Sequence, residues 1–370
     1  PPLSYWLVAG AGAVTGQAQV SPALARAPSV LALVGIALLA AWIGARLFEP
    51  RVGLLAGLMC VASFSAFKYG HNARPDMLYA FWTIAVLAVW LALREVSSRQ
   101  ARYGAWAMWL LFALATLTKG PQAPAIMLGG AVVYDGLFGA GWRAVWRRLH
   151  AVAGVVIVAV IVLPWYLWLR AAIGATTLDD SQVSGALLSV DITRLFAPFY
   201  FLRTPLLWLP WALLLPVAGL QIWRDRRGPS GLLAFGVLFA MAVFTLGPQY
   251  REIYTLPWLA SAMVVFAAAL VRVAALRVAG VYHQWRLFAH DGAGVDVPER
   301  PVSNRRGLEV DDAAFRVSAM ASLLAVSRYD IRMDNTDGVT CHREPVEPLY
   351  EILLFELGSE AHPNDVDLRT

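Results

Sequence analysis

Residues 77–93 read MLYAFWTIAVLAVWLAL, an unbroken run that contains no charged side chain. A membrane is crossed by a helix of about 17–25 predominantly apolar residues, so this run is long enough to span a bilayer. Asp76 precedes the run and Arg94 follows it, which places a charge at each boundary of the apolar segment. The run therefore predicts a transmembrane helix.

Similar runs recur along the chain and set its class. Of the 370 residues, 59% are hydrophobic and 15% are charged, whereas soluble domains have about 45–50% and 25%. These values exclude an ordinary soluble enzyme and a disordered protein, and two cysteines exclude a disulfide scaffold. The sequence predicts an all-α polytopic integral membrane protein with about nine transmembrane helices, at 29–48, 52–69, 77–93, 104–118, 122–138, 150–169, 205–223, 231–247 and 255–271. Residues 3–20 are predicted to form an interfacial helix with Tyr5 and Trp6 at the headgroups.

The distribution of charge predicts the orientation. The net charge is +12 over residues 1–285 and −7 over residues 286–370. The basic part is also the apolar part, so loops between spans explain the basic residues better than nucleic-acid binding, and no nucleic-acid partner is expected. Arginines concentrate in short loops at alternate span ends, which the positive-inside rule assigns to the cytoplasm. Asp76, Lys119 and residues 250–258 then lie on the opposite, outer face of the plasma (inner) membrane.

The last hundred residues differ in composition. Residues 272–370 are predicted to form a small polar, acidic C-terminal tail, with candidate helices at 315–329 and 350–357. The change in character near 275–290 suggests a fusion or a change of reading frame. Residues 1–271 are predicted to form the transmembrane domain.

The first candidate functional segment is His71-Asn72-Ala73-Arg74-Pro75-Asp76-Met77, at the start of the span quoted above. Ionisable groups at the edge of a span are functional candidates because they are expensive there. Asp76 stands beside the positive end of a helix, where it is suited to act as a general base or to ligate a divalent metal. The structural alternative is a helix N-cap with a contact to Arg74.

Two further candidate segments lie on the same predicted face. Lys119, in Leu117-Thr118-Lys119-Gly120-Pro121, is suited to phosphate binding beside a helix N-terminus, and the alternative is a snorkelling interfacial lysine. In residues 249–258, the guanidinium of Arg251 is suited to bind a phosphate or carboxylate group, and Tyr250 or Tyr254 could stack on a sugar ring. The alternative there is an aromatic belt with an Arg251–Glu252 surface pair. Together the three segments favour chemistry on a lipid-linked phosphate.

These segments resemble the membrane glycosyltransferases of the GT-C fold, in the bacterial branch that contains 4-amino-4-deoxy-L-arabinose transferases and protein O-mannosyltransferase-like enzymes. The motifs that carry the resemblance are Pro1-Pro2-Leu3-Ser4-Tyr5-Trp6-Leu7 with Arg26-Ala27-Pro28-Ser29, Ala73-Arg74-Pro75-Asp76-Met77, Leu117-Thr118-Lys119-Gly120-Pro121 and Tyr250-Arg251-Glu252-Ile253-Tyr254-Thr255-Leu256-Pro257. Each motif is short, but their order and spacing across residues 1–271 match the family.

The resemblance implies a polyprenyl-phosphate sugar as donor, an acceptor lipid (as in lipid A modification), glycan or protein, and a site on the outer face. It implies that Asp76 is the second of two acidic active-site residues. Lys119 and Arg251 correspond to positions associated with the carrier phosphate, and Tyr250, Tyr254, Arg74 and His71 are the other substrate-binding candidates. Some family members bind a divalent metal near the acids, so Asp76 is also the candidate metal ligand.

The family pattern also extends beyond this sequence. Its first acid precedes the Pro-Pro-Leu stretch, so we expect that acid, with the first helix and the first outer loop, upstream of Pro1. Two other functions stay open at this point. One is a transporter or flippase of a lipid-linked saccharide, and the other is an inactive fragment of the transferase.

Overall fold

The computed structural model describes residues 2–16, 20–95, 98–173, 199–247, 251–292, 329–333 and 339–343. The chain divides into two compact units, Pro1–Asp291 and Gly292–Thr370. The boundary predicted between residues 271 and 272 falls inside a continuous helix, and the functional division into domains stays a prediction.

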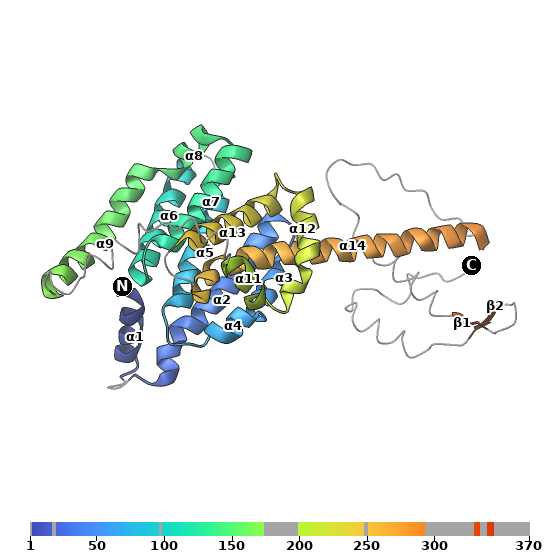
Figure 1. Cartoon of the computed structure of the whole chain (residues 1–370), viewed down its shortest axis with the longest axis horizontal. Coiled ribbons are helices and arrows are strands. Elements are labelled where there is room, and N and C mark those ends of the chain that lie inside the picture. The colour runs from blue at the N-terminus through green and yellow to red at the C-terminus, as the bar shows by residue number, and fades with distance from the viewer. Residues whose placement is uncertain are drawn as a thin grey trace, which may run out of the picture. The chain divides into compact units, whose positions relative to one another are not determined.

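The described residues of the first unit are helical throughout (Figure 1). Its elements are α1 (Leu3–Val14), α2 (Pro22–Leu47), α3 (Pro50–Val61), α4 (Phe64–Tyr69), α5 (Asp76–Leu93), α6 (Ser98–Thr118), α7 (Gln122–Phe138), α8 (Trp142–Leu149), α9 (Ala151–Ile173), α11 (Phe199–Leu207), η2 (Trp211–Leu214), α12 (Leu215–Arg224), α13 (Pro229–Leu246), η3 (Glu252–Trp258) and α14 (Leu259–Gly292), where η marks 3-10 turns. Several helices begin at ordinary start signals. Ser21 caps α2 by accepting the Leu24 N–H at 3.3 Å, and proline occupies the first turn of α2, α3 and α13.

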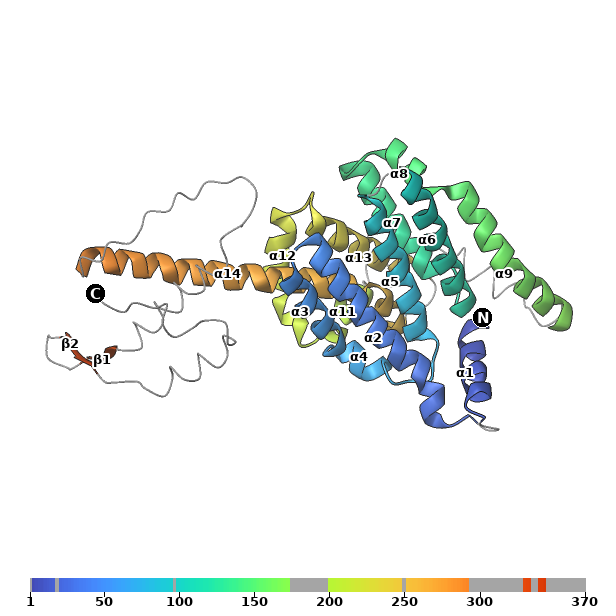
Figure 2. The same ribbon diagram turned by 180° about the vertical axis from the view of Figure 1, so that it is seen from behind.

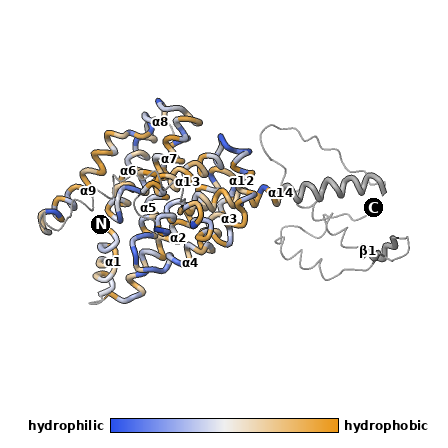
Figure 3. The backbone as a smooth tube through the Cα atoms, in the orientation of Figure 1, coloured by the Kyte–Doolittle hydropathy of each residue, from blue (hydrophilic) through white to orange (hydrophobic). Residues whose placement is uncertain are grey.

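The quoted span forms α5, which lies at the centre of the helix bundle. It packs against α2, α6, α7 and η3, and 78% of its residues are buried (Figure 1 and Figure 2). The α8–α9 stretch is the opposite extreme, because only 11% of its apolar segment is buried. Hydrophobic stretches recur along the helices of the first unit (orange in Figure 3), and leucines and valines such as Leu38, Leu54 and Val152 are largely exposed. An apolar exterior of this kind is suited to contact with the lipid hydrocarbon of a bilayer.

The polytopic helical fold is confirmed, but the count of nine spans is not. Five helices in the described residues are long and apolar enough to cross a membrane, or six if a bent pair is one span. The predicted span 52–69 is broken between α3 and α4 at Ala62–Ser63, and the predicted span 205–223 is bent by 113° between α11 and the η2–α12 segment. Helix α7, which forms the predicted span 122–138, has 17 residues, the lower end of the length that a span needs, and is not among these five.

The two interruptions lie against each other and satisfy each other's polar groups. The Phe64 N–H donates to the Leu209 carbonyl at 2.8 Å, and the Ser65 hydroxyl donates to the Leu207 carbonyl at 2.8 Å. In the other direction, the Trp211 indole N–H donates to the Met59 carbonyl at 3.0 Å. A broken helix inside a membrane needs such partners, because lipid offers none.

Small residues bring α2 and α3 into backbone contact. A Cβ atom on Gly53 would lie 2.3 Å from the Ala41 carbonyl oxygen, and one on Gly44 would lie 2.9 Å from the Cα of Gly53. Close approach through glycine and alanine is a common mode of helix association in membranes.

The second unit has two described strands, β1 (Tyr329–Met333) and β2 (Val339–Arg343), which pair antiparallel with Tyr329 opposite Arg343. Tyr329 therefore begins a strand, whereas the sequence predicted that it ends a helix. The rest of the predicted helix at 315–329 and all of that at 350–357 lie outside the described residues.

We expect Gly53→Leu to destabilise the first unit by about 1–3 kcal/mol, because the new side chain must separate α2 from α3. The measurement is thermal unfolding of the purified chain in detergent. Gly219→Leu in α12 is the matched control, since a Cβ at Gly219 meets nothing within 4 Å. Equal melting temperatures for the two variants would contradict the close packing described here.

Candidate active site

Asp76 is the first residue of α5, and its side chain is buried between two cations. Its residue exposure is 4%. Oδ1 accepts a short hydrogen bond from the Lys119 ammonium, and Oδ2 lies 3.2 Å from the guanidinium Nε of Arg74. The loop before α5 is held to α2, because the Ser29 hydroxyl donates to the Arg74 carbonyl at 2.9 Å. The structure thus brings together Asp76, Lys119 and Arg74, which the sequence placed in two separate motifs.

Lys119 follows the last residue of α6, in a tight connection to α7. Gly120 has a φ of 141°, a conformation that other residues rarely adopt, and it allows the chain to turn directly after the lysine. The ammonium lies 4.9 Å from the ring centre of Tyr254 and 5.9 Å from that of Tyr79. Aromatic faces attract a cation at these distances, so both rings help to hold the ammonium beside Asp76.

Tyr79 is a site residue that sequence reasoning missed. Its hydroxyl accepts the Ala123 N–H at 2.8 Å, which ties α5 to the first turn of α7. The signal was present, because Tyr79 stands three residues after Asp76 and therefore on the same side of the helix. The apolar run 77–93 indicates only a membrane helix at Tyr79 and gives no separate role for its hydroxyl.

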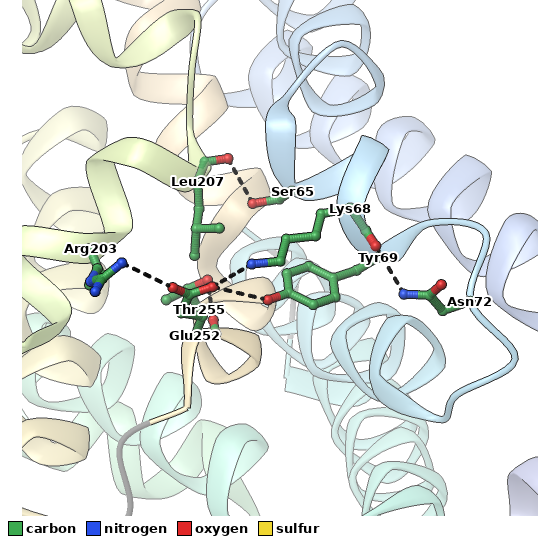
Figure 4. Close-up of polar contacts among 8 residues, drawn as sticks. All are labelled: Ser65, Lys68, Tyr69, Asn72, Arg203, Leu207, Glu252 and Thr255. Atoms are coloured by element: carbon green, nitrogen blue, oxygen red, sulfur yellow. Dashed lines mark hydrogen bonds and ion pairs between the residues drawn. The ribbon is translucent and has the colours of Figure 1, made fainter.

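A second polar cluster lies at the same end of the bundle and centres on Glu252, the first residue of η3 (Figure 4). Its Oε2 is 2.6 Å from the Lys68 ammonium and accepts the Tyr69 hydroxyl at 3.4 Å, while its Oε1 lies 3.6 Å from the Arg203 guanidinium. Glu252 thereby joins α4, α11 and η3, and η3 carries Tyr254. The alternative of an Arg251–Glu252 surface pair is not what the structure shows, because the partners of Glu252 are Lys68, Tyr69 and Arg203.

Aromatic rings back the Tyr254 side of the site. The Phe244 ring centre lies 5.4 Å from that of Tyr254 and 5.5 Å from that of Trp258. Tyr200 packs against Phe244 and Trp258 with centroids 6.1 and 6.3 Å away, and its hydroxyl accepts the Arg251 N–H at 3.2 Å. Because each ring is fixed by the next, Tyr254 is held rigidly over Lys119.

The other predicted residues are not part of the Asp76 contact network. His71 is exposed and lies over the ring of Phe67, at 6.3 Å between centres. The side chain of Arg251 is exposed, and the described partners of this residue contact its backbone: the N–H donates to the Tyr200 hydroxyl and the carbonyl accepts the Tyr254 N–H at 3.1 Å. Tyr250 lies outside the described residues. Roles for these three in substrate binding stay predictions.

A cavity of about 290 Å³ adjoins the site on the α1 side. It is lined mainly by apolar residues of α1 and α2 and by Ala73, Arg74, Pro75 and Leu78. Ser4 also lines it, and its hydroxyl is buried with no hydrogen-bond partner among the described residues. A pocket that is apolar with few polar groups, next to a buried carboxylate, has the character of a ligand site.

The described residues do not form a metal site at Asp76. No group of three or more His, Cys, Asp or Glu side chains in the described parts of the chain could surround an ion. Both oxygens of Asp76 already face cations, Lys119 and Arg74. Metal ligation by Asp76 accordingly stays a prediction.

A double-mutant cycle tests the Glu252 cluster. We expect Lys68→Ala and Glu252→Ala to couple by about 0.5–1 kcal/mol in unfolding free energy, because Glu252 holds several partners in fixed geometry. The Arg46–Glu95 pair, 2.7 Å apart with Glu95 58% exposed, is the control and should couple more weakly. A Lys68–Glu252 coupling indistinguishable from that of the control would show that the cluster does not organise this end of the bundle.

The chain is similar to known proteins in sequence and in fold. A family model described as dolichyl-phosphate-mannose-protein mannosyltransferase matches residues 1–168. An undecaprenyl phosphate-alpha-4-amino-4-deoxy-L-arabinose arabinosyl transferase of Pseudomonas paraeruginosa is 30% identical over 291 residues, which cover 74% of this chain and 50% of that protein. A relative of the same name from Edwardsiella ictaluri is 27% identical over 275 residues, covering 68% and 48%. The chain thus spans about half the length of the curated relatives it matches.

Two solved structures share the fold. ArnT from Cupriavidus metallidurans in the apo state superposes with a TM-score of 0.61 at 21% identity, over 88% of this chain and 59% of that one. The same protein bound to undecaprenyl phosphate gives 0.61 at 22% identity, with the same coverage. The resemblance read from the motifs is therefore confirmed: this chain is similar to the GT-C membrane glycosyltransferases of the aminoarabinose transferase and protein mannosyltransferase type.

Proposed function

We propose that this chain forms the membrane part of a glycosyltransferase that moves a sugar from an undecaprenyl-phosphate-type carrier to a hydroxyl group of an acceptor at the outer face of the membrane. The observation that carries the proposal is the buried Asp76 carboxylate paired with Lys119 and Arg74 at one end of the bundle. The names of the matched arabinosyl transferases, and the carrier lipid bound to the solved relative, support this donor class.

The two cations are suited to bind the carrier phosphate. Lys119 is 25% exposed and Arg74 is 59% exposed, whereas Asp76 is 5% exposed at the side chain, so the cations stand nearer to solvent than the carboxylate they contact. An arriving phosphate would meet the ammonium and the guanidinium first and would share them with Asp76. Both groups form strong charge-assisted bonds to phosphate oxygens.

Asp76 then has a role as general base. Once the phosphate engages Lys119 and Arg74, an oxygen of Asp76 is released to accept the proton of the acceptor hydroxyl. The hydroxyl oxygen attacks the anomeric carbon, the bond from that carbon to the phosphate oxygen breaks, and the electron pair leaves on the carrier phosphate. Lys119 stabilises the negative charge that develops there. Attack opposite the leaving group inverts the anomeric carbon.

This reaction requires only a hydroxyl group on the acceptor, so the acceptor can be a lipid, a glycan or a protein. The apolar cavity beside Arg74 favours an acceptor or carrier with a hydrocarbon part, because its walls offer few hydrogen bonds. We place the site on the periplasmic face, since the arginine-rich loops predict the other end as cytoplasmic.

The distribution of buried charge favours this enzyme over a transporter or flippase. In the described residues the buried charged side chains are Asp76 and Asp135, at the first residue of α5 and in the last turn of α7. A transporter would be expected to carry ionisable groups near the middle of its spans. Here the middle of each described span is apolar or holds only hydroxyl groups such as Thr83.

Lys119→Ala should weaken binding of undecaprenyl phosphate and reduce turnover by about 10²–10³-fold, because the leaving phosphate loses its main cation. The assay is transfer from undecaprenyl-phosphate-linked sugar in membranes that contain the protein. Arg46→Ala is the matched control, since Arg46 is a partly exposed cation that pairs with Glu95, just beyond the end of α5 opposite Asp76. Full transfer by the Lys119 variant would refute the assignment.

Asp76→Asn should behave differently. We expect turnover to fall by about 10²–10⁴-fold, the usual worth of a general base, while undecaprenyl phosphate still binds because both cations remain. The control is Glu95→Gln, which should retain activity. Glu95 is an exposed acid just beyond the C-terminal end of α5, whereas Asp76 is the first residue of that helix. Loss of carrier binding together with turnover would assign Asp76 a structural role instead.

A further inference from the structure

Helix α8 is the feature of the molecule that the proposed chemistry does not use. Its eight residues, WRAVWRRL, show three distinct sides. Val145 and Leu149 are buried against the bundle, Trp142 and Trp146 are 43% and 61% exposed, and Arg143 and Arg147 are exposed. Residues four apart lie on the same side of a helix, so each pair forms one stripe.

The bundle holds α8 firmly. Asp135, near the end of α7, is buried and accepts the Trp90 indole N–H at 3.0 Å. Arg94 lies 3.3 Å from one oxygen of Asp135, and Arg148 of α8 lies 3.8 Å from the other. The Trp109 indole N–H donates to the Leu149 carbonyl at 2.8 Å, which fixes the end of the helix.

Its position follows from α7. The first turn of α7 contacts Tyr79 beside the candidate active site, while its last turn holds Asp135. A helix of 17 residues is about 25 Å long, so α8 lies at the opposite end of the bundle from Asp76. It leads directly into α9, the apolar helix with little buried surface (Figure 1 and Figure 3). Because α9 faces lipid, α8 lies where lipid headgroups begin.

The exposed stripes of α8 have a combined chemistry. No acidic side chain among the described residues pairs with Arg143 or Arg147, in contrast to Arg148. Tryptophan prefers the boundary between hydrocarbon and headgroups, and guanidinium binds phosphate with paired hydrogen bonds. Basic side chains near a membrane surface are attracted to anionic lipids. The two stripes therefore match one occupant, a phosphodiester headgroup with its acyl chains.

We propose that α8 is a binding site for anionic phospholipid at the membrane face opposite the candidate active site. Arg143 and Arg147 contact the headgroup phosphate, while Trp142 and Trp146 lie beside the upper acyl chains. The Asp135 cluster keeps Arg148 turned inward, so that α8 presents a fixed surface. This site is independent of the proposed transfer reaction.

The test measures lipid binding by the full 370-residue chain purified in detergent. Native mass spectrometry gives the apparent affinity for added phosphatidylglycerol and for phosphatidylcholine of matched chain length. We expect phosphatidylglycerol to bind more tightly than phosphatidylcholine. The substitutions Arg143→Gln and Arg147→Gln should each weaken the binding of phosphatidylglycerol by about fivefold. Arg143→Lys with Arg147→Lys should retain most of the preference, and it checks that the helix still folds.

Arg226→Gln with Arg227→Gln is the matched control. These exposed arginines lie at the same end of the bundle, because the Tyr134 hydroxyl donates to the Arg226 carbonyl at 3.0 Å, but Asp225 stands next to them. The control should keep phosphatidylglycerol binding within about twofold of the parent chain. Equal affinity for both lipids in the parent chain, or an equal loss in the control and the α8 variant, would overturn the proposal.

Discussion

The constraint on which the site depends is the burial of a carboxylate at the first residue of α5. A buried charge lowers the stability of the folded protein unless it is paired, and removal of one partner leaves an unpaired charge in the interior. Asp76 is paired by Lys119, which arrives from the end of α6, and by Arg74 from the preceding loop. The same pairing that makes the carboxylate tolerable also assembles a cationic surface beside it. Stability and the proposed phosphate binding thus share one set of contacts.

Helix α5 is fixed in the same manner at its other end. Trp90 and Arg94, near its end, contact Asp135 of α7, a second buried acid. The central helix is therefore held at both ends by carboxylates with cationic partners, and by apolar packing between them. This arrangement explains why α5 can position Asp76 rigidly although the helices around it face lipid. It also explains why the bundle presents polar chemistry at its ends and an apolar surface along its sides.

Much of this was accessible from the sequence, for identifiable reasons. The apolar run at 77–93 predicted α5 because length and hydrophobicity suffice to identify a buried membrane helix, and Asp76 and Lys119 were conspicuous because charge interrupts such runs rarely. The partners of Glu252 were not predictable, since Lys68 and Arg203 are remote in sequence and a surface pair with Arg251 was equally consistent. Tyr79 was missed because an aromatic residue in an apolar run carries no signal of its polar contact. The breaks near Ser63 and Leu209 were missed because hydropathy does not register hydrogen bonds between two distant segments.

Those two breaks have a consequence for how such a protein can change over time. The carbonyls at Leu207 and Leu209 accept from Ser65 and Phe64, and the carbonyl at Met59 accepts from Trp211. Straightening either segment alone would leave polar backbone groups of the other facing hydrocarbon. Each interruption therefore depends on the other for its hydrogen-bond partners, and a change that straightens one carries an energetic cost at both.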